Sequence, residues 1–237
     1  MTFLVVEGSA AVRTSLCYVL LSFGIKALSA TGRREALDIL GAQTGVEGAI
    51  IDIDTREVEG PELIRQMRES DSLRNVKIVV HTIQASKELV VRMVEDGVAG
   101  YLLKPYKEDQ IYDKLKKVLD RTLSHDSQRR HIRVKPDPEE LLRLSFRLPG
   151  LPGMISGRVV DISVGGVAVE LFNPPTADAL KPLTQIPSIQ FTLLRKQFAP
   201  PGKVVLFKEN LLAVRFDFLT TAEKTALARY VFKRIAS

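Results

Sequence analysis

The first half of the chain alternates short apolar runs with stretches of helical periodicity. Each run has the length of a strand, and in the stretch after it apolar residues recur every three to four positions. Strands that alternate with helices form parallel sheets covered on both faces, so we predict a five-stranded, doubly wound α/β domain over residues 1–123. The predicted strands are TFLVV, IKALSA, GAIIDID, VKIVVHT and GYLLKP, and the fourth helix is KELVVRMVEDG, residues 87–97.

The second half has a different periodicity. Runs such as GVAVELF and LLAVRFDF resemble strands, and turns rich in Gly and Pro, such as FAPPGK, separate them. The closing segment TAEKTALARYVFKRIAS has helical spacing, with Thr221 as its expected N-cap. We therefore predict that residues 138–237 form an antiparallel β-barrel with a terminal helix. Residues 124–137 are then the junction between the two domains.

The net charge of +6 is unevenly distributed. Residues 1–123 carry 17 Lys and Arg against 18 Asp and Glu, a balance of −1, and residues 124–237 carry 17 against 10, a balance of +7. A positive second half favours an anionic partner. A DNA-binding transcriptional regulator is the weaker interpretation, because this β-rich half shows no helix-turn-helix pattern, and no DNA partner is expected.

Several classes of protein are disfavoured by simple features. The longest apolar runs are too short to span a bilayer, so no membrane insertion is expected. Glu7 interrupts the N-terminal apolar run, which reads as a strand and not as a signal peptide. The single cysteine, Cys17, excludes an intramolecular disulfide, and the expected location is cytoplasmic. Neither half shows a hydrolase or synthetase motif, so no enzyme is expected.

Polar side chains follow several of the predicted strands in the first half. In a doubly wound sheet, functional groups gather at the carboxyl ends of the strands. Convergence of several such residues is more informative than any one of them, and it indicates a functional site at this edge. The residues placed there are Glu7, Asp52, Asp54, Thr82 and Lys104.

This half resembles the receiver domain of two-component response regulators. Asp52 stands eight residues before Gly60, Thr82 ends the fourth strand in HT, Lys104 begins KP after the fifth, and Tyr101 matches the switch aromatic of that family. The resemblance implies that Asp52 accepts a phosphoryl group, which Thr82 and Lys104 hold. It also implies a sensor histidine kinase as partner and a homodimer through this domain.

The chain departs from that family after the first strand, where it reads VVEGS. Receivers have two acidic residues there that bind Mg²⁺, and the second is Gly8 in this chain. Glu7, Asp52 and Asp54 are the candidate Mg²⁺ ligands that are left, with Asp54 as a substitute for the missing carboxylate. Two alternatives stay open: a receiver phosphorylated on Asp52, and a degenerate receiver that serves as a dimerising or docking platform.

Two motifs in the basic half have the chemistry of a nucleotide site. RRHIR places three arginines within five residues, and DISVGG places an acid and a hydroxyl before two glycines. An arginine donates two parallel hydrogen bonds to phosphate or to the O6/N7 edge of guanine, and a carboxylate accepts from guanine's other edge. Glycines allow a tight turn and close approach. The candidate ligand residues are Arg129, Arg130, Arg133, Asp161, Ser163 and Gly166.

In this order and spacing, R-x-x-x-R and [D/N]-x-S-x-x-G resemble the motifs of the PilZ domain, a small β-barrel that binds cyclic di-GMP. The match covers roughly residues 128–236. The resemblance implies cyclic di-GMP as ligand, with Arg129 and Arg133 as the main cations, and motility, adhesion and biofilm formation as the processes controlled. Gln128, where some members have arginine, favours one dinucleotide per protomer.

The predicted function is a non-enzymatic signalling adaptor. Binding of the dinucleotide would reorient the two domains and pass the signal to an unknown downstream protein. The alternative is a protein-interaction scaffold in which both sites are vestigial.

Overall fold

The computed structural model describes most of the chain, and this part divides into two compact units, Met1–Arg130 and His131–Ser237. Arg129 and Arg130 lie outside the described residues, as does most of the predicted helix at 87–97. The described residues are 1–84, 86, 91, 95–106, 108–122, 131–137 and 139–235.

The first unit is built on a parallel sheet with the strand order β2-β1-β3-β4-β5. Its central strands are buried on both faces, which is why they read as continuous apolar runs. Phe3, Leu4, Val5 and Val6 of β1, for example, are completely buried. The strands are β1 (Thr2–Val6), β2 (Lys26–Ala30), β3 (Val46–Asp52), β4 (Lys77–Thr82) and β5 (Gly100–Leu103).

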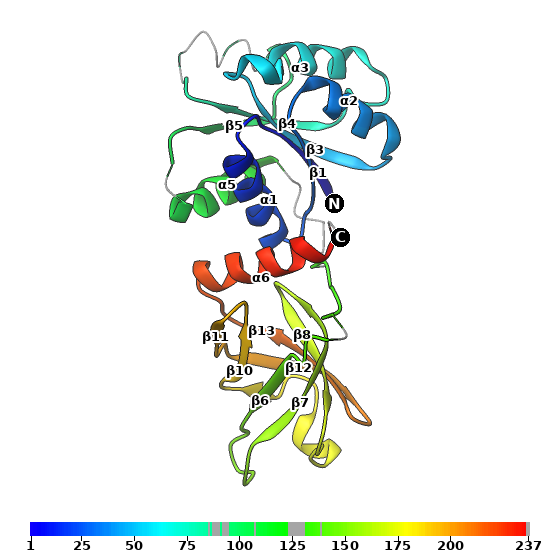
Figure 1. The fold of residues 1–237 in the computed structure, drawn as a ribbon, viewed down its shortest axis with the longest axis vertical. Coiled ribbons are helices and arrows are strands. Elements are labelled where there is room, and N and C mark those ends of the chain that lie inside the picture. The colour runs from blue at the N-terminus through cyan, green and yellow to red at the C-terminus, as the bar shows by residue number, and fades with distance from the viewer. Residues whose placement is uncertain are drawn as a thin grey trace. The chain divides into compact units, whose positions relative to one another are not determined.

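Helices cover both faces of this sheet. Figure 1 shows α1 (Ala10–Ser22) and α5 (Glu108–Thr122) on one face, and α2 (Arg33–Ala42) and α3 (Gly60–Glu69) on the other. The ring of Phe23, just after α1, stacks on Tyr112 of α5 with the ring centroids 4.5 Å apart. The predicted doubly wound α/β fold is confirmed.

The loop after β3 folds back closely on the end of its own strand. A short 3-10 helix, η1 (Arg56–Val58), leads into α3, whose first residue is Gly60. A Cβ atom on Gly60 would lie 2.1 Å from the backbone oxygen of Asp52, a separation that real Cβ atoms essentially never show. Glycine at this position therefore allows the loop to bring Asp52 and Thr55 to the edge of the sheet.

The second unit is an antiparallel sheet of eight strands in the order β11-β10-β6-β7-β8-β13-β12-β9. The sheet curls (Figure 1), and β11 and β9 are its two free edges among the described strands, so the predicted antiparallel fold is confirmed as a half-barrel open along one side. The strands are β6 (Arg143–Phe146), β7 (Ile155–Ser163), β8 (Gly166–Leu171), β9 (Gln185–Ile186), β10 (Ile189–Leu193), β11 (Lys196–Phe198), β12 (Gly202–Lys208) and β13 (Leu211–Phe216), with a 3-10 helix η2 (Ala177–Leu180) before β9.

A terminal helix, α6 (Thr221–Ile235), packs on this sheet with Leu227 and Tyr230 fully buried. Its N-cap is Thr220, not Thr221 as predicted. The Thr220 hydroxyl accepts from the Glu223 N–H at 3.2 Å, and the Glu223 carboxylate accepts from the Thr220 N–H at 2.8 Å, which is a capping box. No helix in the described part of the chain is long and apolar enough to cross a membrane.

Candidate functional site

The first unit brings the predicted polar side chains together at the carboxyl edge of its sheet. Lys104 follows β5, and its Nζ lies 2.8 Å from Asp52 Oδ1, 3.4 Å from Glu7 Oε2 and 3.7 Å from Asp54 Oδ2. Asp52 is completely buried and Glu7 is only 3% exposed. One ammonium group therefore faces three carboxylates.

Two of these carboxylates are also hydrogen-bonded within the unit. Asp52 accepts from the Asp54 backbone N–H at 3.0 Å and from the Thr55 hydroxyl. Asp54 accepts from the Thr82 hydroxyl at 2.9 Å and from the Ile83 N–H at 2.7 Å. The predicted hydroxyl of Thr82 thus lies in the site, but its partner there is Asp54 and not Asp52.

Glu7 is held by a residue that sequence analysis did not single out. Its Oε1 accepts from the Ser9 N–H at 3.0 Å, and its Oε2 lies 2.8 Å from Nδ1 of His81. Nε2 of His81 lies 2.8 Å from the Tyr106 hydroxyl. The available signal was His81 itself, a polar residue inside the apolar run of β4, where a buried polar group needs a partner.

These contacts shift the ionisation of the site. Burial is the largest single influence on Asp52 and would raise its pKa, but hydrogen bonds from Lys104, Thr55 and the Asp54 N–H together lower it below the ordinary 3.8. Burial is likewise outweighed at Glu7, where bonds from His81 and Ser9 lower the pKa below 4.5. Burial would lower the pKa of Lys104, yet its hydrogen bond to Asp52 and the surrounding carboxylates raise it.

A Mg²⁺ ion in this arrangement would have to share its ligands with protein donors. Mg²⁺ requires near-octahedral oxygen ligands, and every carboxylate oxygen of Glu7, Asp52 and Asp54 already accepts at least one hydrogen bond. Gly8 adds no ligand and lines a cavity of about 650 Å³. Over the described ranges, no three or more His, Cys, Asp or Glu side chains are grouped so that they could hold a metal ion.

Lys104→Met is expected to make the first unit more sensitive to acid. Folding lowers the pKa values of Asp52 and Glu7, so their stabilisation is complete above their ordinary values of 3.8 and 4.5 and is lost as the pH falls through the lower folded values. Without the ammonium group the folded pKa values rise, and unfolding begins at a higher pH. Near-UV circular dichroism during an acid titration measures the midpoint.

Lys116→Met is the matched control for this titration. Lys116 is an exposed lysine of α5 that lies 4.0 Å from Asp120, and exposed pairs of this kind contribute little to stability. The control should keep the wild-type midpoint. Equal shifts in the two variants would contradict the role assigned to Lys104.

The second predicted site lies where residues 131–137, called the strap below, meet the end of β7. Val134 and Ile162 exchange two backbone hydrogen bonds of 2.9 Å. Next to this bridge, Nη1 of Arg133 lies 3.7 Å from Oδ2 of Asp161, with the Arg133 side chain 62% exposed. Asp161 is partly exposed, and a long contact with so exposed an arginine contributes little to stability. Both side chains are therefore available to a ligand.

The turn between β7 and β8 is held by its own backbone and by Ser163. The Ser163 hydroxyl donates to the Gly166 carbonyl and accepts from the Gly165 N–H, both at 3.2 Å. A Cβ atom on Gly165 would lie 2.1 Å from the His131 ring, and one on Gly166 would lie 2.3 Å from the Val214 carbonyl oxygen. The strap and β13 therefore both approach this turn closely. Of the predicted ligand residues, the structure brings together Arg133, Asp161, Ser163 and Gly166, while Arg129 and Arg130 lie outside the described residues.

The sheet places a further arginine beside this turn. Arg215 of β13 stands opposite Gly166, which in turn stands opposite Ser163 of β7. Arg215 is exposed, between two buried neighbours. Arg215 was not among the residues predicted from the sequence, although a polar residue in the alternating run LLAVRF belongs on the face away from the core.

The strap is also anchored by the terminal helix. The Tyr230 hydroxyl donates to Glu140 at 2.6 Å, and Arg234 pairs with Glu140 and, at 3.2 Å, with Asp137. The Arg234 guanidinium lies 3.6 Å from the centre of the Tyr230 ring. Burial, together with the hydrogen bond to Glu140, raises the pKa of Tyr230. The segment that carries Arg133 is thus bound both at Val134 and around residues 137–140.

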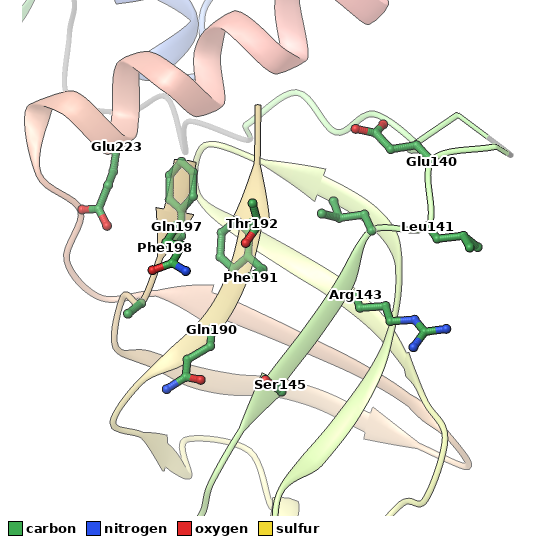
Figure 2. Close-up of a pocket in the computed structure, with 12 residues that line it drawn as sticks. Glu140, Leu141, Arg143, Ser145, Gln190, Phe191, Thr192, Gln197, Phe198 and Glu223 are labelled. Atoms are coloured by element: carbon green, nitrogen blue, oxygen red, sulfur yellow. The ribbon is translucent and has the colours of Figure 1, made fainter. Parts of the chain in front are cut away.

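A cavity of about 890 Å³ lies elsewhere in the second unit (Figure 2). Side chains of β6, β10 and β11 line it, among them Ser145, Gln190 and Gln197, together with Glu223 of α6. Arg133, Asp161 and Ser163 do not line it. The predicted ligand residues therefore form a site separate from this cavity.

The two units match two known domain families. Residues 3–116 match the response regulator receiver domain, and residues 127–233 match the PilZ domain. A chemotaxis protein CheY homolog of Campylobacter jejuni is 29% identical over 120 residues, which are 50% of this chain and 92% of that protein. The two-component response regulator ORR11 of Oryza sativa is 25% identical over 116 residues, 49% of this chain and 79% of that protein.

Among solved structures, chemotaxis protein CheY4 of Vibrio cholerae matches with 24% identity and a TM-score of 0.46, over 52% of this chain and 98% of that one. The matches to the receiver family and its curated relatives cover about half of this chain, and the PilZ match covers residues in the other half. The chain is therefore a response-regulator-type signalling protein in which a receiver domain is joined to a PilZ domain.

Proposed function

We propose that this protein is a signalling adaptor that binds cyclic di-GMP between the strap and the β7–β8 turn. The observation that carries the proposal is the pair of the exposed Arg133 and the partly exposed Asp161, 3.7 Å apart, beside Ser163 and Gly166. Arginine suits phosphate or the O6/N7 edge of guanine, and a carboxylate suits guanine's N1–H and N2–H₂ edge. One ligand that carries guanine and phosphate satisfies both side chains.

Binding would exchange the contact between Arg133 and Asp161 for contacts with the ligand. The strap is anchored at Val134 and at Asp137, so the change is expected to be passed along the chain to the junction at residues 124–130, which precedes the strap. Arg129 and Arg130 in that segment would supply further cations. A change at such a junction is a general way to reorient domains and to present a surface to a downstream protein.

For the first unit, the hydrogen bonding favours a docking platform, including a homodimer, as its function. Phosphorylation of Asp52 by a sensor histidine kinase is the second candidate, supported by the 2.8 Å contact of Lys104 with Asp52. Beryllofluoride with Mg²⁺ separates the two candidates. A spectral change in wild type that is absent in Asp52→Ala favours phosphorylation, and equal responses favour the docking platform.

Calorimetric titration of cyclic di-GMP into the full chain tests the main proposal. Wild type is expected to bind one dinucleotide per protomer at micromolar concentration, because Gln128 offers no additional stacking cation. Arg133→Ala should weaken binding roughly 5- to 150-fold, since a bidentate arginine contact with a base contributes about 1–3 kcal/mol. The absence of heat in wild type would overturn the proposal.

Arg158→Ala is the matched control for this titration. Arg158 is a similarly exposed arginine of β7 that pairs with Glu170 at 3.5 Å, outside the turn. The control should bind the dinucleotide as wild type does. If both variants lose affinity equally, the loss comes from removing one positive charge from the second unit and not from a specific contact of Arg133 with the ligand.

A further inference from the structure

Glu7, His81 and Tyr106 form a continuous chain of hydrogen bonds inside the first unit. The Glu7 carboxylate lies 2.8 Å from Nδ1 of His81, and Nε2 of the same ring lies 2.8 Å from the Tyr106 hydroxyl. A neutral imidazole satisfies both contacts when Tyr106 donates to Nε2 and the Nδ1–H donates to Glu7. The ionised Glu7 only accepts and so requires the tautomer with a proton on Nδ1, and the Tyr106 hydroxyl holds the ring in that position by donating to Nε2.

This chain determines what Glu7 can do. His81 is completely buried, so turning Glu7 toward a cation would leave the Nδ1–H of His81 without an acceptor and without water. The other oxygen of Glu7 accepts from the Ser9 N–H at 3.0 Å. Glu7 is therefore committed to protein donors through both oxygens.

Lys104 already supplies positive charge where a cation would be needed. Its ammonium group lies within 3.7 Å of Glu7, Asp52 and Asp54. A divalent cation entering among these carboxylates would meet this ammonium at a distance where the repulsion is strong. Gly8 provides no compensating ligand.

We infer that His81 and Tyr106 are positioning residues that hold Glu7 away from metal ligation, and that Lys104 is the resident cation, so that the carboxylate site of the first unit is complete without a divalent cation. The inference goes beyond the binding of cyclic di-GMP and does not depend on it. It makes Glu7 a structural partner of His81 and not a metal ligand.

The test is thermal unfolding of the full chain in millimolar MgCl₂ against NaCl of equal ionic strength. A ligand that binds only the folded state raises the unfolding temperature. Wild type should show no rise specific to Mg²⁺. Gly8→Asp restores an acid at a position where the atoms nearest to an added Cβ belong to the Thr55 and Val58 side chains, the first at 3.1 Å. This variant should respond weakly because Glu7 stays with His81.

Gly8→Asp/His81→Val frees Glu7 and should bind Mg²⁺ roughly tenfold more tightly than Gly8→Asp, a difference within the range seen for hydrogen-bond partners of metal ligands. Gly8→Asp/Tyr106→Phe keeps the His81 ring and removes only the Tyr106 hydroxyl. If the valine variant does not fold, the Mg²⁺ affinity of this second variant, compared with that of Gly8→Asp, tests the inference. Gly41→Asp controls for an added carboxylate, since Gly41 has open space around it. A rise specific to Mg²⁺ in wild type, or no gain over Gly8→Asp in the variants that fold, overturns the inference.

Discussion

Gly60→Ala is expected to lower the free energy of unfolding of the first unit by about 3 kcal/mol, at the upper end of the cost of overpacking. The added Cβ atom would lie 2.1 Å from the Asp52 oxygen, 2.9 Å from its carbonyl carbon and 3.0 Å from Cα of Ile53. All three are backbone atoms, so no side-chain rotation relieves the clash. Urea denaturation of the full chain, followed by circular dichroism, measures the loss.

Gly41→Ala is the matched control, because a Cβ atom there meets nothing within 4 Å and the residue lies in α2. Alanine in a helix is favoured over glycine by up to about 1 kcal/mol, so this variant should be equally stable or more stable. If Gly60→Ala behaves like Gly41→Ala, the close approach of the loop to β3 is not a constraint on the fold.

Asp161→Ala is expected to reduce the affinity for cyclic di-GMP roughly 5- to 150-fold, the value of one bidentate contact with a base. The variant removes the acceptor for guanine's N1–H and N2–H₂ groups, and these donors then lose their partner when the ligand binds. The preference over cyclic di-AMP should fall with the affinity, because adenine lacks those donors. Competition calorimetry with the two dinucleotides measures both effects.

Asp178→Ala controls for the loss of a negative charge from the second unit. Asp178 is exposed and pairs with Lys181 at 2.9 Å, away from the β7–β8 turn. Its removal should leave both dinucleotide affinities unchanged. An Asp161→Ala variant that folds and still discriminates between the two ligands would show that guanine is read elsewhere.

Much of the fold was predictable because its central strands are strong signals. TFLVV is continuous and apolar because β1 is buried on both faces. Strands β6, β9 and β11, of four, two and three residues, were not predicted, because so short a segment has little measurable alternation and is defined by its partners. The N-cap prediction was wrong by one residue, although Glu223 stands three positions after Thr220, the spacing of a capping box.

The place of the candidate site in the fold was predictable from the sequence, but the hydrogen-bond partners within the site were not. Parallel strands end at one edge, so Glu7, Asp52 and Lys104 had to converge there. His81 stands out as a polar residue in an apolar run, but which donor each carboxylate takes depends on side-chain rotamers, and no periodicity reveals these. In the second unit, the pairing of Arg133 with Asp161 follows from one isolated bridge between Val134 and Ile162, too short to leave a pattern in the sequence.

The position of Lys104 among three carboxylates has a thermodynamic consequence. A bound ion loses translational freedom when it enters a site, and its occupancy follows its concentration in solution. The ammonium of Lys104 is covalently part of the chain. It therefore loses no translational freedom on entering the site, and its occupancy does not depend on the concentration of any ion. If Lys104 is the resident cation, as we infer, the charge balance of this edge of the sheet is the same in a chelating buffer as in one rich in magnesium, and it changes only when the chain moves or its carboxylates are protonated.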